Sequence, residues 1–187
     1  MKKILLIAVM LCSLFASVCA AEADKYKLQN SDFTEGLRFW IGANRLKLSP
    51  EALGFVIEKQ DGKNVLVARG REKKKDFQLV QHINLKTEQI LNKKVTFGAM
   101  VNPEKLTGTF RVMIREVGKK GTIRYRIISM NKYTPAGWKK YVSEFVVSAP
   151  TVCIQFYIKS EYLGAGDQVF LKEPFITIEP RKKAGTI

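Results

Sequence analysis

Residues 77–85 read Phe-Gln-Leu-Val-Gln-His-Ile-Asn-Leu, and this stretch decides the class of fold. Its odd-numbered positions are apolar apart from Gln81, whereas its even-numbered positions carry Gln78, His82 and Asn84 beside a single valine. A period of two is the spacing of a β-strand that buries one face and exposes the other. The stretch is therefore predicted to be a half-buried strand.

The same alternation returns in the segments 95–101, 110–114, 123–127 and 152–158. Turn-forming pairs such as Asp61-Gly62, Asn102-Pro103 and Ala149-Pro150 separate these segments. Roughly eight to ten short strands at this spacing, without a long helical pattern, predict an all-β fold, a two-sheet jelly-roll β-sandwich. The alternation assigns six residues to its core, which are Phe97, Val112, Ile127, Val152, Ile154 and Phe156.

The amino terminus predicts export. Met1-Lys2-Lys3 precedes an apolar run and then Val18-Cys19-Ala20, which places small residues where a signal peptidase cuts. We therefore expect residues 1–20 to be a signal peptide, residues 21–180 to be the sandwich and residues 181–187 to be a basic tail. The apolar run is shorter than the roughly 20 residues that span a bilayer, so no transmembrane segment is expected after cleavage. The predicted location is periplasmic or extracellular.

Charge is the second compositional signal. The chain has 32 lysines and arginines against 17 acidic residues, a formal net charge of +15. Such a surface attracts anions. For an exported chain the expected anion is an acidic polysaccharide or a cell envelope, and no nucleic acid is expected. A solvated basic surface without one ligand stays open as the simpler interpretation.

One motif resembles a known family. Asn30-Ser31-Asp32-Phe33, followed by Gly36 and Trp40, resembles the opening Asn-Gly-Asp-Phe, Gly, Trp of the galactose-binding-like β-sandwich modules attached to bacterial cellulases and xylanases. Segments similar to the family's later strands follow in order, at 78–85, 94–101, 137–147, 150–158 and 166–178. The resemblance implies a galactose-binding-domain-like fold and carbohydrate binding without catalysis.

Related modules often hold a structural calcium ion, which takes six to eight oxygen ligands. Asp32, Glu35 and Glu173 are the calcium candidates that the resemblance implies here. The family's last strand usually carries two adjacent aspartates, but this chain has Lys172-Glu173 at that place. We therefore predict no cofactor and retain the three carboxylates only as candidates.

The chain offers little for catalysis. After removal of the expected signal peptide, His82 is the one histidine and Cys153 the one cysteine. The strand context Thr151-Val152-Cys153-Ile154 favours an inert, buried thiol. A pair of glycosidase carboxylates is not recognisable from sequence alone, since any two strands can bring such a pair together. The better prediction is that the chain is not an enzyme.

A binding face is predicted from strand phase. Tyr157 lies opposite in phase to the apolar row of its strand, on the side of Gln155. If the strands share a sheet, the outward positions form a face rich in guanidinium and amide groups, which suit carboxylate or sulfate ligands. Trp40 and Trp138 are the alternative stacking aromatics, although both are expected to be packed rather than exposed. The candidate ligand residues are Arg111, Arg115, Arg124, Arg126, Gln78, His82, Gln155 and Tyr157.

Two functions from different classes follow. The first is an exported, non-catalytic carbohydrate-binding module that holds an acidic or a neutral polysaccharide on a sheet face or at the loop rim, with the acidic polymer favoured by the basic charge. The second is a structural or adhesive protein of the cell envelope that uses the same fold for protein contact.

Overall fold

The computed structural model of the chain describes residues 26–42, 54–71, 76–85 and 90–179. The expected signal peptide and the basic tail lie outside these residues. In the described ranges, no helix has the length and apolar content that would carry it across a membrane.

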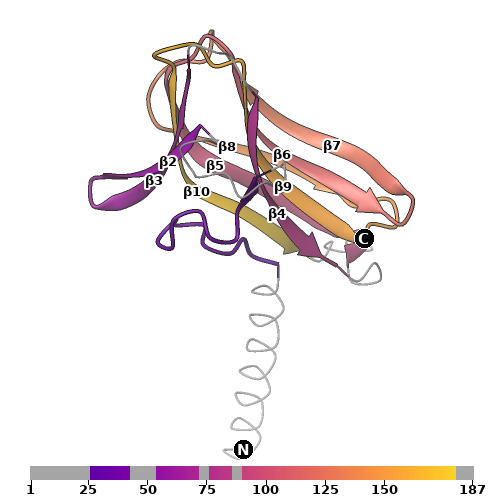
Figure 1. Cartoon of the computed structure of the whole chain (residues 1–187). Coiled ribbons are helices and arrows are strands. Elements are labelled where there is room, and N and C mark those ends of the chain that lie inside the picture. The colour runs from indigo at the N-terminus through magenta and orange to yellow at the C-terminus, as the bar shows by residue number, and fades with distance from the viewer. Residues whose placement is uncertain (1–25, 43–53, 72–75, 86–89, 180–187) are drawn as a thin grey trace, which may run out of the picture.

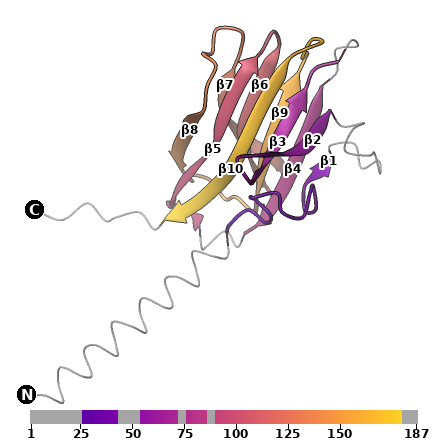
Figure 2. The ribbon, with the colours of Figure 1, turned by 90° about the vertical axis from the view of Figure 1, so that its left-hand side faces the viewer.

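The described residues form strands and turns, which confirms the predicted all-β sandwich. The strands are β1 (Ile41–Gly42), β2 (Phe55–Gln60), β3 (Lys63–Arg69), β4 (Phe77–Asn84), β5 (Lys94–Lys105), β6 (Thr109–Gly118), β7 (Gly121–Met130), β8 (Lys139–Val146), β9 (Cys153–Glu161) and β10 (Gln168–Glu179). They pair antiparallel in two five-stranded sheets that lie face to face (Figures 1 and 2). The first sheet has the order β1-β4-β9-β6-β7, and the second sheet has the order β2-β3-β10-β5-β8.

Aromatic rings fill the space between the sheets. Phe97 of β5 and Phe156 of β9 are fully buried, and their ring centres lie 6.4 Å apart in an edge-to-face arrangement. Such a pair contributes roughly 0.5–1.5 kcal/mol beyond the burial of its area. Val112 and Ile154 are buried in the same cluster, as the alternation predicts, while Val152 is only half-buried.

The segment before β1, drawn in indigo in Figure 1, closes one side of this core. Its organiser is Asn30, whose side-chain amide donates to the carbonyl oxygens of Gly36 and Arg38 while its oxygen accepts the Glu35 amide. The indole of Trp40 donates back to the Asn30 carbonyl, and the ring is 5% exposed. Trp40 is therefore a core residue, as predicted.

Trp138 packs at a different place from the main core. It lies half-buried against Val65, Val67 and Phe170, a small apolar cluster on the outer side of the second sheet. The ammonium of Lys172 lies 4.1 Å from the centre of its ring, a cation–π contact. This contact and the apolar cluster occupy the indole, so Trp138 is packed rather than an open platform.

The turn predicted at Asn102-Pro103 is wrong, because β5 continues to Lys105. Proline has no amide hydrogen and is tolerated in a strand only where no neighbour needs that hydrogen. The pairing of β5 with β8 ends at Val101, so one side of β5 has no neighbouring strand at Pro103.

The main difference from the sequence prediction lies in β7, where the residues that face the core are not the ones that the alternation assigned to it. Ile127 was expected in the core but is 49% exposed, and the side chains of Arg124 and Arg126 face the interior instead. The cause is Glu116 on neighbouring β6, whose carboxyl group is fully buried and has the Arg124 Nε 2.9 Å away. Arg126 lies over the ring of Phe145 in the opposite sheet, 5.4 Å from its centre. A buried carboxyl group requires such partners, because burial without them is costly.

Truncating Phe156 to alanine is expected to lower the free energy of unfolding by about 3–5 kcal/mol, as removal of a buried aromatic side chain does. Ile127→Ala is the matched comparison, with an expected change of about 0.5 kcal/mol because that side chain faces solvent. Urea denaturation measures both changes. A larger loss for Ile127→Ala than for Phe156→Ala would contradict the strand phase described above.

A second prediction concerns the buried carboxyl group. Burial raises the pKa of Glu116 above its ordinary value of 4.5, against the opposing effects of Arg124 and Arg126. The folded state therefore binds this proton more tightly than the unfolded state, and the resulting stability is present below that ordinary value and is lost as pH rises through the raised pKa. Subtracting the unfolding free energy of Glu116→Gln from that of the parent should give a difference that falls with rising pH. A difference that is independent of pH would contradict the assignment.

Candidate functional site

The outer face of the first sheet carries three parallel rows of side chains that cross the strands. Residues paired in register share a face, so the register defines each row. The central row is apolar apart from one hydroxyl and contains Ile41, Val80, Tyr157, Met113 and Ile127. The flanking rows are mainly polar: one contains Gln78, Lys159, Arg111 and Ser129, and the other contains His82, Gln155, Arg115 and Tyr125.

A hollow of about 370 Å³ lies on this face over β7, β6 and β9. Tyr125 and Ile127 form one side of it and are 48% and 49% exposed. None of the described residues that line it is acidic; the full lining is Gln78, Arg111, Met113, Arg115, Tyr125, Ile127, Tyr157 and Lys159. We call it the first hollow.

Arg115 is the charged group best placed to meet a ligand there. Its Nε donates to the Thr122 hydroxyl at 2.7 Å, and its guanidinium lies 5.9 Å from the ring centre of Tyr125. A hydrogen bond to Tyr157 raises the pKa of the Arg115 guanidinium above its ordinary value. Among the described residues no carboxylate forms an ion pair with it, so its partners on this face are neutral.

The other two cations of the first hollow are largely neutralised. Glu161 accepts from Arg111 at 2.9 Å and also pairs with Lys159, and it is itself buried. Asp76 lies 3.7 Å from the Lys159 ammonium. The positive charge available to a ligand is therefore concentrated at Arg115.

A chain of hydrogen bonds fixes the polar groups of this face. The Tyr157 hydroxyl donates to the Gln155 side-chain oxygen at 2.8 Å, and the Gln155 amide nitrogen lies 3.4 Å from His82 Nδ1. Together with the contact between Arg115 and Tyr157, this chain links three neighbouring strands. The side chains are thus oriented before any ligand arrives, which reduces the entropy lost on binding.

The structure brings together six of the eight predicted ligand residues, namely Gln78, His82, Arg111, Arg115, Gln155 and Tyr157. The expectation that Arg124 and Arg126 share this face is wrong, because both serve the buried Glu116 region. Strand phase placed Lys159 on this face, beside Tyr157, but did not find Met113, Tyr125 and Ile127 as lining residues. The sequence does contain one signal for them. Glu116 stands at a core position of β6, and a buried acid needs basic partners, which the adjacent strand could supply only by turning its arginines inward.

Asp32 and Glu173 line one hollow, but Glu35 does not line it, so the three calcium candidates do not form one ligand set. Glu35 pairs with Arg38, Glu173 pairs with Lys63, and Asp32 accepts from the Thr34 hydroxyl. Within the described ranges, no group of three or more histidine, cysteine, aspartate or glutamate side chains is arranged to hold a metal ion.

Cys153 and His82 both project from the outer face of the first sheet, but in the part of the chain that the structure describes no hydrogen bond joins them. Burial raises the pKa of the half-buried Cys153 thiol, which disfavours the reactive thiolate. His82 has Gln155 as its neighbour across the strands. This arrangement lacks the base beside a nucleophile that covalent catalysis requires.

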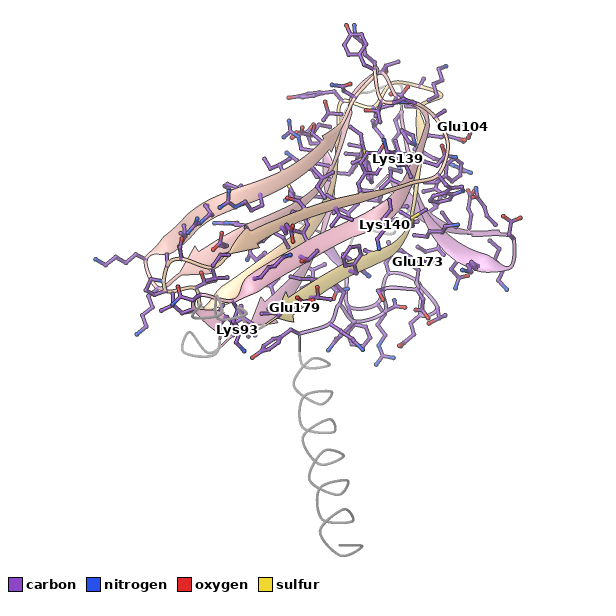
Figure 3. The ribbon with its side chains drawn as sticks, turned by 180° about the vertical axis from the view of Figure 1, so that it is seen from behind. Lys93, Glu104, Lys139, Lys140, Glu173 and Glu179 are labelled. Carbon is purple, nitrogen blue, oxygen red and sulfur yellow. The ribbon has the colours of Figure 1, made fainter. Side chains whose placement is uncertain are left out.

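The opposite face of the sandwich has a different character. Lys139, Lys140, Glu173 and Glu179 lie on the side shown in Figure 3, where both signs of charge alternate. Ion pairs such as Lys94 with Glu144 and Lys63 with Glu173 neutralise much of it. Among the described residues, the outer face of the first sheet is therefore the better candidate for a ligand site than the opposite face.

The fold is the β-sandwich found in carbohydrate-binding modules. TmCBM61, solved in complex with β-1,4-galactotriose, matches with a TM-score of 0.59 at 16% identity, over 81% of this chain and 97% of that chain. A family 16 carbohydrate-binding module matches with a TM-score of 0.57 at 12% identity, over 80% and 97% of the two chains. No protein-family model and no curated protein matches the sequence.

A cyclase from Fischerella sp. TAU has the same architecture, with a TM-score of 0.56 at 15% identity over 83% of this chain and 97% of that chain. The fold is thus shared by binding modules and by a protein named for catalysis. Because a fold does not by itself define a function, the chemistry of the site must decide between them.

Proposed function

We propose that this chain is an exported, non-catalytic carbohydrate-binding protein, and that its ligand is an acidic polysaccharide held on the outer face of the first sheet. The observation that carries the proposal is the environment of Arg115. This guanidinium lines the first hollow, has neutral partners and lies beside Tyr125 and Tyr157. An arginine fork binds a carboxylate through two parallel hydrogen bonds.

The apolar floor of the hollow supports a sugar as the ligand. Exposed Tyr125 and Ile127 offer flat and apolar surface, and Gln78 offers an amide group for sugar hydroxyls. Ligand sites typically combine such a surface with a few placed polar groups. The signal-like residues 1–20 support export to a place where polysaccharides occur.

The lining also favours binding over catalysis. A glycosidase needs two carboxyl groups about 5–10 Å apart across the scissile bond. The described lining of the first hollow contains no carboxyl group, and the neighbouring Glu161 is committed to Arg111 and Lys159. Retention of the polymer without cleavage is therefore the expected activity.

Arg115→Ala should weaken binding to a uronic-acid polymer about tenfold, because a hydrogen bond to a charged group contributes about 1.5 kcal/mol. Arg69→Ala is the matched control, since Arg69 is exposed on the second sheet and pairs with Glu58. Calorimetry or affinity electrophoresis against uronic, sulfated and neutral polymers, at low and high salt, measures the effect. Binding by the parent should fall as salt screens the charge.

Two outcomes would contradict the proposal. Tight, salt-independent binding of a neutral polysaccharide that ignores Arg115→Ala would reject the acidic ligand and leave the aromatic groups as the recognition element. Failure to bind any polymer of the panel would reject carbohydrate binding and favour an envelope protein that contacts other proteins.

A further inference from the structure

A second hollow lies at the β4 edge of the first sheet, beside β1, and its lining takes buried residues from the inner side of β4, such as Gln81, and exposed residues from its outer side, such as His82. Its volume is about 390 Å³, and it shares no lining residue with the first hollow. Its apolar side is formed by Phe39 and Ile41, which are 42% and 52% exposed. Exposed large apolar side chains grouped around a hollow are typical of a binding surface.

The backbone at Phe39 is unusual for a residue of its size. The Trp40 amide donates to the Leu37 carbonyl and closes a β-turn, in which Phe39 occupies the third position with φ of +70°. Glycine or asparagine is preferred there, because a bulky side chain clashes with the backbone at positive φ. Phe33 and Tyr162 also have positive φ, but the Phe33 ring is buried in the core and the 62% exposed Tyr162 lines neither hollow.

Core packing therefore compensates the strain at Phe33 but not at Phe39. The Phe39 ring has the Arg38 guanidinium 4.9 Å from its centre and is still substantially exposed. Strained residues of this kind gather at functional sites. A ring held at the surface at a cost in backbone energy is available for contact with a ligand.

The central apolar row connects the two hollows. It runs from Ile41 on β1 through Val80 and Tyr157 to Met113 and Ile127 on β7. The four steps between neighbouring strands, each about 4.8 Å, give it a length of about 19 Å. Polar rows flank it on both sides. Val80 and Met113 are only 5% and 9% exposed, so an extended chain of sugar rings that crosses the strands would meet apolar surface at the two ends of this row and at half-buried Tyr157, with hydrogen-bonding groups along both of its edges.

We propose that the second hollow is a distal subsite for an uncharged sugar ring, so that the ligand is an internal stretch of a linear polysaccharide that crosses the strands from Arg115 to Phe39. This inference rests on the proposed function and specifies the length and direction of its ligand. Phe39 and Ile41 supply the apolar contact. His82 and Asn84 supply polar groups at the rim.

The polar groups around the second hollow divide into structural and available ones. Gln81 is buried and exchanges two hydrogen bonds with the Gln29 backbone, at 2.7 and 3.0 Å, so it fixes the wall. His82 and Asn84 are exposed. Lys27 is the one charged residue among the described lining residues, and it already takes part in an interaction within the protein, whereas the other lining groups are neutral. The second hollow therefore suits a neutral ring.

The test uses the full mature chain and oligosaccharides of increasing length, prepared from the polymer that the parent binds best. Affinity should rise with length until the oligomer reaches both hollows. Phe39→Gly should leave the shortest oligomers unaffected and weaken the longest by roughly five- to tenfold, the loss of one aromatic contact. Tyr133→Ala, which removes an exposed aromatic ring of the β7–β8 connection, is the matched control and should change nothing.

The unfolding temperature of Phe39→Gly distinguishes a binding role of Phe39 from a purely structural one. Because glycine adopts positive φ without strain, Phe39→Gly should unfold at an equal or higher temperature than the parent while binding the long oligomer more weakly. Equal affinity of the parent for short and long oligomers, or full binding by Phe39→Gly, would overturn the distal subsite while leaving the proposed function intact. Arg115→Ala tests the proposed function separately: binding about tenfold weaker at every length supports it, and unchanged binding contradicts it.

Discussion

The carboxyl group of Glu116 is buried between the two sheets, and its need for partners constrains the strand beside it. Arg124 and Arg126 turn inward from β7, the first in an ion pair with Glu116 and the second with its guanidinium over the ring of Phe145, from where its charge also acts on Glu116. Since side chains alternate along a strand, Tyr125 and Ile127 must then face outward. A buried polar interaction on one side of the sheet thus determines the aromatic and apolar surface on the other side.

The outer face of the first sheet follows from this constraint. Without the inward arginines, Tyr125 and Ile127 would be core residues and the first hollow would lose one side. The same face keeps Arg115 among neutral partners, while Glu161 neutralises Arg111 and Lys159. A basic chain therefore presents one available guanidinium in the hollow rather than a uniform positive surface, which favours a ligand with charge at defined positions.

The galactose-binding-like motif near the amino terminus has a structural role. Asn30 organises the turns of the segment 30–40 through three hydrogen bonds, and Phe33 and Trp40 close the core. These residues serve turn formation and core packing, which explains why the motif accompanies the fold. The shared architecture of binding modules and of a cyclase agrees with this separation of scaffold and site.

The sequence by itself determined the sandwich class, most of the core and the outward phase of β4, β6 and β9, because burial of one sheet face imposes a period of two. It did not determine the phase of β7, where Arg-Tyr-Arg-Ile alternates equally well in either direction. Only the tertiary structure decided that phase, since Glu116 acts through the pairing of β6 with β7. The second hollow likewise depends on the placement of Phe39 beside β4, a contact between segments distant in the chain that no local pattern encodes.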